Sequence, residues 1–198
     1  VSANTALTNL KCYNNSLTTL DVSANTALTF LHCENNQLTS LDVSNNTALT
    51  DFNCSNNQLT TLDVSNNTAL EELNTQDNSL TSLDVSANTA LTELSCAGNN
   101  LTTQDVSNNT ALTFLYNSEN QLTSLDVSNN PLLTYLEIRG NQLTYLNMRN
   151  GVTDALTTFD ATGNDLTCIE VNAEDVAYAT ANWTNANDNI DAGVAFAD

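Results

Sequence analysis

Leucines mark the chain at a nearly constant interval, and polar residues fill most of the positions between them. Seven of these leucines follow one another at steps of 21 residues, and the eighth follows after 23 residues. They are Leu7, Leu28, Leu49, Leu70, Leu91, Leu112, Leu133 and Leu156. The two extra residues fall in the stretch MRNGVTDA, residues 148–155. This periodicity indicates an array of eight repeats.

Each repeat contains two similar patterns of apolar and polar residues, one in each half. The first half reads L-x-x-L-x-C-x-x-N-x-L, as in residues 28–38, and the second reads L-x-x-L-x-V-x-x-N, as in residues 38–46. Neither pattern has helical periodicity, and about ten residues leave room only for a short strand and a turn. We therefore predict a mostly β fold: a solenoid of eight rungs with two parallel sheets and mild curvature. Leu, Val and Cys should point inward between the sheets.

One asparagine recurs in every repeat, at the end of the first half. These residues are Asn15, Asn36, Asn57, Asn78, Asn99, Asn120, Asn141 and Asn164. A side-chain amide can satisfy backbone groups where a chain turns sharply, so a buried asparagine is acceptable there. We predict a column of stacked asparagines inside the solenoid.

These repeats carry the leucine-rich-repeat signature, and the chain resembles bacterial leucine-rich-repeat proteins of the short nested type, sometimes called IRREKO. The resemblance covers residues 1–171 as the solenoid. Residues 172–198 resemble the C-terminal cap of secreted and surface leucine-rich-repeat proteins from Bacteroidetes, and should belong to the same structural domain. The resemblance implies an exported protein, often carried to the cell surface by a sorting domain beyond the cap. It implies no defined activity.

Both ends of the chain interrupt a pattern. Residues 1–7 repeat the sequence of residues 22–28, so we expect the chain to begin inside a repeat. At the other end, the relatives' cap is usually followed by another cysteine, which is absent here. Cys168 should therefore lack a partner that the longer protein supplies.

The composition narrows the classes of partner. Three Lys and Arg residues against 23 Asp and Glu give a formal net charge of −20. This charge argues against nucleic acid and anionic membranes, which attract basic patches. No apolar run approaches the roughly 18 residues of a membrane span, so we expect no membrane insertion. Protein or polysaccharide ligands remain open, and we expect a monomer.

Outward positions of the first sheet vary from repeat to repeat, as a binding face should. We predict that this face binds protein or glycan as a recognition or adhesion module. The central group is expected to be Phe114, Tyr116, Tyr135, Glu137 and Arg139. The other candidate contacts on this face are Phe30, His32, Asp51, Glu72 and Glu93. A stabilising ladder of side chains without any ligand is the alternative explanation.

Catalysis on the same face is disfavoured. Asp51, Glu72 and Glu93 stand at successive rungs, and paired carboxylates serve retaining glycosidases. A flat sheet, however, offers no water-excluding pocket to separate their acidities. His32 has no nucleophile beside it, because Cys33 points to the opposite side. We therefore predict that the protein is not an enzyme.

A second regular face offers a different function, that of a scaffold binding cations or ice. An aspartate recurs outward in the second half of six repeats: Asp21, Asp42, Asp63, Asp84, Asp105 and Asp126. Serines flank these aspartates, and a column of threonines runs beside them. Calcium could bridge successive carboxylates, although a flat column supplies few of the six to eight oxygens that calcium prefers. Otherwise each Asp accepts local hydrogen bonds, and no cofactor is required.

Cysteines 12, 33, 54 and 96 share one inward position of the repeat. Side chains that run parallel in one sheet have the wrong mutual orientation for a disulfide. We predict free thiols packed in the core.

Overall fold

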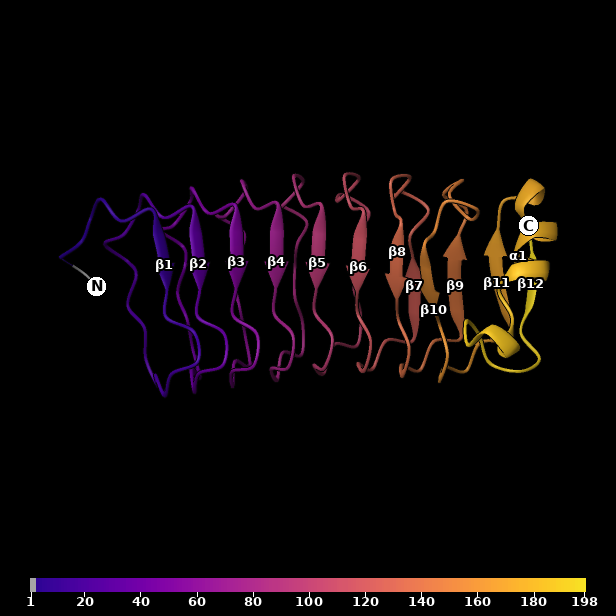
Figure 1. Ribbon diagram of the computed structural model, residues 1–198, viewed down its shortest axis with the longest axis horizontal. Helices are drawn as coiled ribbons and strands as arrows, with labels where there is room; N and C mark the ends of the chain where they lie inside the picture. Colours follow the sequence, from indigo (N-terminus) through magenta and orange to yellow (C-terminus); the bar gives the residue numbers. More distant parts are fainter. Residues whose placement is uncertain (1–2) are drawn as a thin grey trace.

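Each repeat forms one rung of an elongated solenoid, and the computed structural model describes residues 3–198 of it. The rungs stack from the N-terminal end on the left of Figure 1 to the C-terminal helix on the right. Strands on the two broad sides of the solenoid run in opposite directions (Figure 1), because the chain passes up one side and down the other in every repeat.

An eight-stranded parallel sheet, called sheet A here, is built from the first halves of the repeats. Its strands, in order, are β1 (Asn9–Lys11), β2 (Phe30–His32), β3 (Asp51–Asn53), β4 (Glu72–Asn74), β5 (Glu93–Ser95), β6 (Phe114–Tyr116), β8 (Tyr135–Glu137) and β10 (Thr158–Asp160). Each residue pairs with its counterpart in the next repeat, as Leu31 does with Phe52. From β2 onward the middle residue of each strand is buried, so the two flanking residues face outward.

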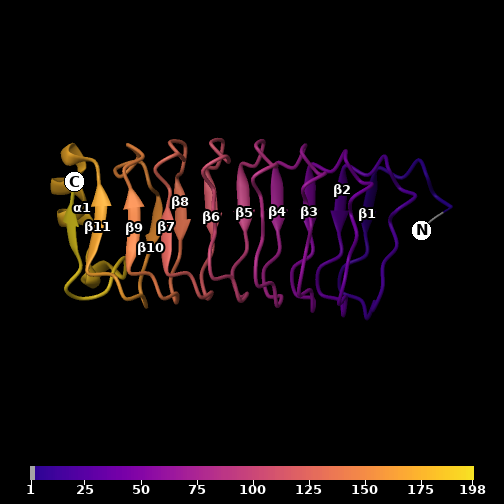
Figure 2. The same ribbon diagram turned by 180° about the vertical axis from the view of Figure 1, so that it is seen from behind.

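The second parallel sheet, sheet B, has four strands in the order β12-β11-β9-β7. They are β7 (Ser124–Asp126), β9 (Tyr145–Met148), β11 (Cys168–Val171) and β12 (Ala195–Ala197). The prediction of two parallel sheets is confirmed, but sheet B occupies only the C-terminal part of its face (Figure 2). In the preceding repeats the second halves have no regular strand between residues 17 and 106.

Sheet B begins next to a change in the aspartate column. Neighbouring aspartates such as Asp42 and Asp63 repel one another, and like charges directly opposite weaken strand pairing. Asn147 follows Asp126 in this column and carries no charge. Its side-chain amide donates a hydrogen bond of 3.1 Å to Asp126 Oδ2, so β7 and β9 pair without that repulsion.

A single C-terminal helix caps the last rung. The cap comprises a 3₁₀ turn at Ala173–Asp175, helix α1 at Val176–Asn182, a second 3₁₀ turn at Asn185–Asn187, and β12. Trp183 is buried after α1, and its ring lies 4.2 Å from that of Phe159 and 5.9 Å from that of Phe196, centroid to centroid. The apolar end of the solenoid is thereby shielded from water.

The predicted asparagine column forms the polar spine of the solenoid. In each repeat from Asn36 to Asn164 the side-chain oxygen accepts from a leucine N–H one rung earlier, at 2.9–3.0 Å. The side-chain nitrogen of Asn57 donates to the carbonyls of Cys54 and Cys33, on its own rung and on the previous one. These bonds satisfy backbone groups that have no sheet partner.

A left-handed backbone position precedes each of these asparagines. Asn14, Asn35, Asn56, Asp77, Gly98, Glu119, Gly140 and Gly163 all have φ between 51° and 67°. Gly, Asn and Asp tolerate this conformation, whereas a longer side chain is strained there. Glu119 is the one member of the column with such a side chain.

Candidate functional site

The C-terminal half of sheet A carries the aromatic group that the sequence predicted. Phe114 and Tyr135 are paired in register, and their rings stack with centroids 4.1 Å apart at an angle of 18°. Tyr116 pairs in register with Glu137 on the next strand. Partial burial is the main cause that raises the pKa of Tyr135, and a hydrogen bond with Glu137 raises it further. All three aromatic residues are half-buried, so they form a shallow apolar platform.

Arg139 lies outside this platform. It follows β8 in the turn, in the column that holds the buried residues Ser55 and Ser118. Its guanidinium contacts the Glu119 carboxylate at 3.5 Å, and both side chains are more than half exposed. Among residues 3–198, the ion pair found for Arg139 is with Glu119 and not with Glu137. Arg139 therefore lies at the rim of the sheet.

The N-terminal part of sheet A brings together a second group of predicted residues. His32 Nε2 lies 2.9 Å from Asp51 Oδ1, a diagonal contact between β2 and β3. The ring of Phe30 lies 3.9 Å from that of His32, and the Lys11 ammonium lies 5.0 Å from the Phe30 centroid. Lys11 and Asn53 are the in-register neighbours of His32, so column positions alone do not predict the contact with Asp51.

Between the two aromatic groups runs an acidic strip, formed by Asp51, Glu72 and Glu93. The three carboxylates stand in register on successive strands. Partial burial and repulsion by Asp51 and Glu93 raise the pKa of Glu72. The depression over these strands measures about 130 Å³. The strip therefore favours cationic groups such as an ammonium or a guanidinium.

The thiol of Cys33 is not part of this arrangement. Cys33, the thiol nearest to His32 in sequence, is fully buried, and burial raises its pKa. A buried thiol with a raised pKa is unreactive, so the His32–Asp51 pair has no reacting partner in Cys33.

On the opposite face, the six predicted aspartates accept local hydrogen bonds. In each case Oδ1 accepts from the backbone N–H of the serine two residues later, at 2.8–3.0 Å. Hydrogen bonds from serine lower the pKa of Asp21, Asp42, Asp63, Asp84 and Asp105. Within residues 3–198 no three His, Cys, Asp or Glu side chains gather as metal ligands would. The geometry thus favours the local hydrogen-bonding role over a calcium bridge.

The same face holds two residues that the sequence reasoning missed. Gln104 stands where the neighbouring repeats have Leu83 and Leu125, and it is buried. Tyr145 stands where the preceding repeats have Ser or Thr, and it is 40% exposed. Each departs from an otherwise regular column, and that departure was a signal available in the sequence.

The five cysteines are free in the structure. Cys33, Cys54 and Cys96 are buried in their shared inward column, and Cys12 and Cys168 are half-buried. Burial raises the pKa of Cys54 to about 12. This agrees with the prediction of packed thiols.

Two family models match short segments of the chain. The Leucine Rich repeat model matches residues 129–146, and the LVIVD repeat model matches residues 54–75. A search of curated proteins finds no match.

Solved structures give a much longer match. The functional domain of InlJ from Listeria monocytogenes, which includes a cysteine ladder, shares 42% sequence identity over 86% of this chain, with a TM-score of 0.78. The chain is a leucine-rich-repeat protein. It spans 40% of the length of the InlJ structure.

Other leucine-rich-repeat structures share the fold at lower identity. The ectodomain of the Arabidopsis thaliana receptor kinase GASSHO1/SCHENGEN3, in complex with Casparian strip integrity factor 2, is 23% identical, with a TM-score of 0.76 over 86% of this chain and 24% of its own. An internalin (inlF) from Listeria monocytogenes is 24% identical, with a TM-score of 0.69 over 84% of this chain and 58% of its own. No helix among residues 3–198 of the leucine-rich-repeat chain is long and apolar enough to cross a membrane.

Proposed function

We propose that this leucine-rich-repeat chain is a non-enzymatic recognition module that binds a protein through sheet A. The observation that carries the proposal is the order of side chains across the sheet. Phe30 and His32 stand at one end, the Phe114–Tyr135 stack stands at the other, and the acidic strip lies between. Aromatic anchors beside a band of one charge are typical of protein interfaces.

The negative charge of the acidic strip determines which kind of partner fits sheet A. The strip has no Lys or Arg within it, and the raised pKa of Glu72 reflects burial and repulsion by its acidic neighbours. A partner segment with Lys or Arg residues would relieve that repulsion, and its apolar side chains would cover the aromatic groups. A protein with a basic segment therefore fits sheet A better than a neutral glycan does.

The relatives support the class of function. The GASSHO1/SCHENGEN3 ectodomain is bound to Casparian strip integrity factor 2. Because this chain shares the fold of that ectodomain, we propose that it too binds a partner through its repeats. The 21-residue nested repeat and the C-terminal cap resemble those of secreted and surface proteins of Bacteroidetes, so we infer that the module acts outside a bacterial cell, in adhesion or recognition.

A displayed library of random peptides tests the proposal. Peptides that bind should combine Lys or Arg with at least one aromatic or aliphatic anchor. Tyr135→Ala should weaken their binding about tenfold or more, and Glu72→Gln combined with Glu93→Gln should remove the preference for basic sequences. Thr61→Ala on the opposite face is the control. If no peptide is enriched, or if the enriched peptides bind the double Gln variant equally well, sheet A does not bind a basic protein.

A further inference from the structure

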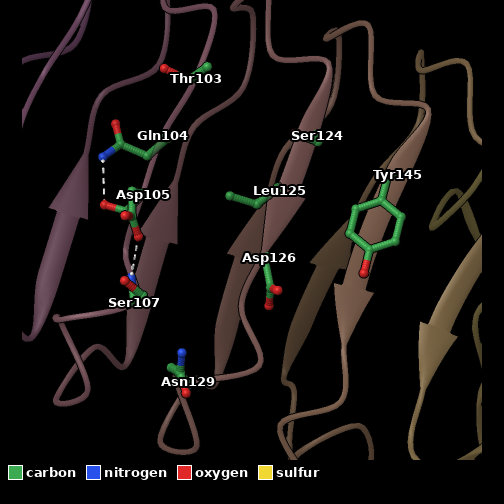
Figure 3. A pocket seen from close by; sticks show the side chains of 9 residues that line it. All are labelled: Thr103, Gln104, Asp105, Ser107, Ser124, Leu125, Asp126, Asn129 and Tyr145. Carbon is green, nitrogen blue, oxygen red and sulfur yellow. Dashed lines mark hydrogen bonds between the residues drawn. The ribbon is translucent and has the colours of Figure 1, made fainter.

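A pocket lies on the face opposite sheet A. It is a pocket of about 380 Å³ at the start of sheet B, within the size range of roughly 300–1,000 Å³ that small-molecule sites occupy. In Figure 3, Gln104 lies at one side of this pocket and Tyr145 at the other, with Leu125 and Asp126 between them. The earlier repeats form a related trough, lined by Thr, Ser, Leu and Asp alone.

Gln104 is poorly satisfied by its surroundings. Its Nε2 donates to the carbonyls of Leu83 and Asp105, both at 3.4 Å, which is long for a hydrogen bond. Its Oε1 is buried without a hydrogen-bond partner. An unmade bond at a buried polar group costs about 1–3 kcal/mol, and the leucine of the neighbouring repeats would avoid that cost. Oε1 is buried, so the side chain would have to turn toward the pocket before a ligand could donate the missing bond.

Tyr145 supplies a fixed apolar surface at the other side. Its hydroxyl donates a 2.9 Å hydrogen bond to Glu170 Oε2, and Arg149 also contacts this carboxylate. The ring is thus held by its tip while 40% of the residue stays exposed. Rigid aromatic side chains of this kind contribute contact area at little cost in conformational entropy.

The charged and polar groups at the rim of the pocket determine which kind of ligand fits it. Asp105 and Asp126 both have a lowered pKa, so both are anionic at neutral pH. Ser124 adds a hydroxyl beside them. A ligand that suits this rim carries several hydroxyl donors, has an apolar face for Tyr145, and carries no negative charge.

We propose that this pocket binds a short saccharide of one or two pyranose rings, neutral or amino-bearing. The ring's C–H face would pack on Tyr145, and its hydroxyls would donate to Asp105, Asp126 and Gln104 Oε1. Gln104 and Tyr145 stand two rungs apart, roughly 10 Å, which a disaccharide spans. The site is separate from sheet A and does not depend on the protein-binding function.

Titration of the ¹⁵N-labelled chain with four probes tests the site: cellobiose, chitobiose, glucosamine and glucuronic acid. At least one of the first three should shift the Gln104 side-chain amide and the backbone amides of residues 103–105 and 124–126 saturably. Glucuronic acid should not, because the two carboxylates repel it. The double variant Gln104→Leu with Tyr145→Thr gives the pocket the residues of the other repeats and should still fold. Its affinity should fall about tenfold or more, whereas Thr61→Ala in the earlier trough should leave it unchanged.

Three results would overturn the inference. One is the absence of saturable shifts with all three uncharged or amino-bearing probes up to about 10 mM, a range that covers weak millimolar binding. Another is unchanged saccharide binding by the double variant. The third is saturation of the pocket by calcium chloride with no response to the saccharides, which would make Asp105 and Asp126 part of a cation site instead.

Discussion

The side-chain oxygen of Asn99 accepts a 3.0 Å hydrogen bond from the backbone N–H of Leu80, one rung earlier. The Asn99 side-chain nitrogen also donates to the carbonyls of Thr75 and Cys96, at 3.0 and 3.1 Å. With a further bond of 3.2 Å to the carbonyl of Ala97, one side chain satisfies four backbone groups on two rungs.

Asn99→Ala should therefore lower the free energy of unfolding by about 3 kcal/mol, because it leaves several buried backbone groups without partners. Urea denaturation measures this loss. Asn100→Ala is the matched control, since the neighbouring side chain is exposed and should cost less than about 0.5 kcal/mol. Equal effects of the two substitutions would refute the role of the asparagine column.

Glu119→Gly should stabilise the protein by about 1 kcal/mol. Glu119 holds φ at 53°, a conformation that costs a side chain with Cβ about 1–2 kcal/mol, and glycine removes this cost. The lost ion pair with Arg139 is exposed, so it contributes little. Thermal unfolding should show a melting temperature about 2–4 °C higher.

Gly140→Ala is the complementary test of the same column. A Cβ at Gly140 would lie 2.9 Å from the Glu119 carboxylate and would also adopt φ of 64°. This variant should be destabilised. In a Glu119→Gly background the clash disappears and only the strain of the backbone remains, so the loss should be smaller. A stabilised Gly140→Ala would contradict the argument.

Asp21 should titrate below its ordinary pKa of 3.8 because the hydroxyl and the backbone N–H of Ser23 both donate to its carboxylate. Its folded pKa is depressed, so its contribution to stability is present above the unfolded pKa and is lost as the pH falls through the folded pKa. Ser23→Ala should move the Asp21 pKa back toward 3.8, as seen by ¹³C NMR of the carboxyl.

The pKa of Glu72 should be shifted in the opposite direction to that of Asp21. Its folded pKa is raised above 4.5, so protonation favours the folded state and this contribution is lost as the pH rises through the folded pKa. A Glu72 that titrates at or below 4.5 would show that burial and repulsion by its acidic neighbours do not dominate at this carboxyl.

Cys33, Cys54 and Cys96 should resist alkylation in the native protein at pH 8, because burial raises the pKa of each thiol. Iodoacetamide labelling followed by mass spectrometry measures the reaction at each site. Unfolding in urea should expose all five thiols to labelling, since all are free. Native labelling of Cys54 as fast as of the half-buried Cys168 would show that the inward column is open to solvent.

The sequence predicted the features that depend on the repeat period. Eight equivalent positions stack because each rung repeats the last, so the register of sheet A, the inward cysteines and the asparagine column could all be inferred. A residue such as Leu31 has its neighbour fixed at Phe52 by counting alone.

The features that were missed depend on side-chain reach and on single departures from the pattern. His32 reaches diagonally to Asp51, and Arg139 reaches back to Glu119, and neither direction follows from a column position. Asn147 alters the charge of one column at a single rung, and its hydrogen bond to Asp126 across the start of sheet B was not predicted. The sequence shows Gln104 as an interruption of the leucine column. That its side-chain oxygen lacks a hydrogen-bond partner depends on the packing around it and could not be predicted.

The strict register of sheet A fixes the distances between side chains along the face of the module. Phe30 and Phe114 stand in the same column four rungs apart, roughly 19 Å at the spacing of neighbouring strands. Recombination between identical segments of the gene would add or delete a whole repeat without disturbing the packing of the others. Each such event would lengthen or shorten the gap between the aromatic ends by roughly 4.8 Å and change the number of carboxylates between them by one. Partner preference could thus evolve in discrete steps of length, with no substitution at any contact residue.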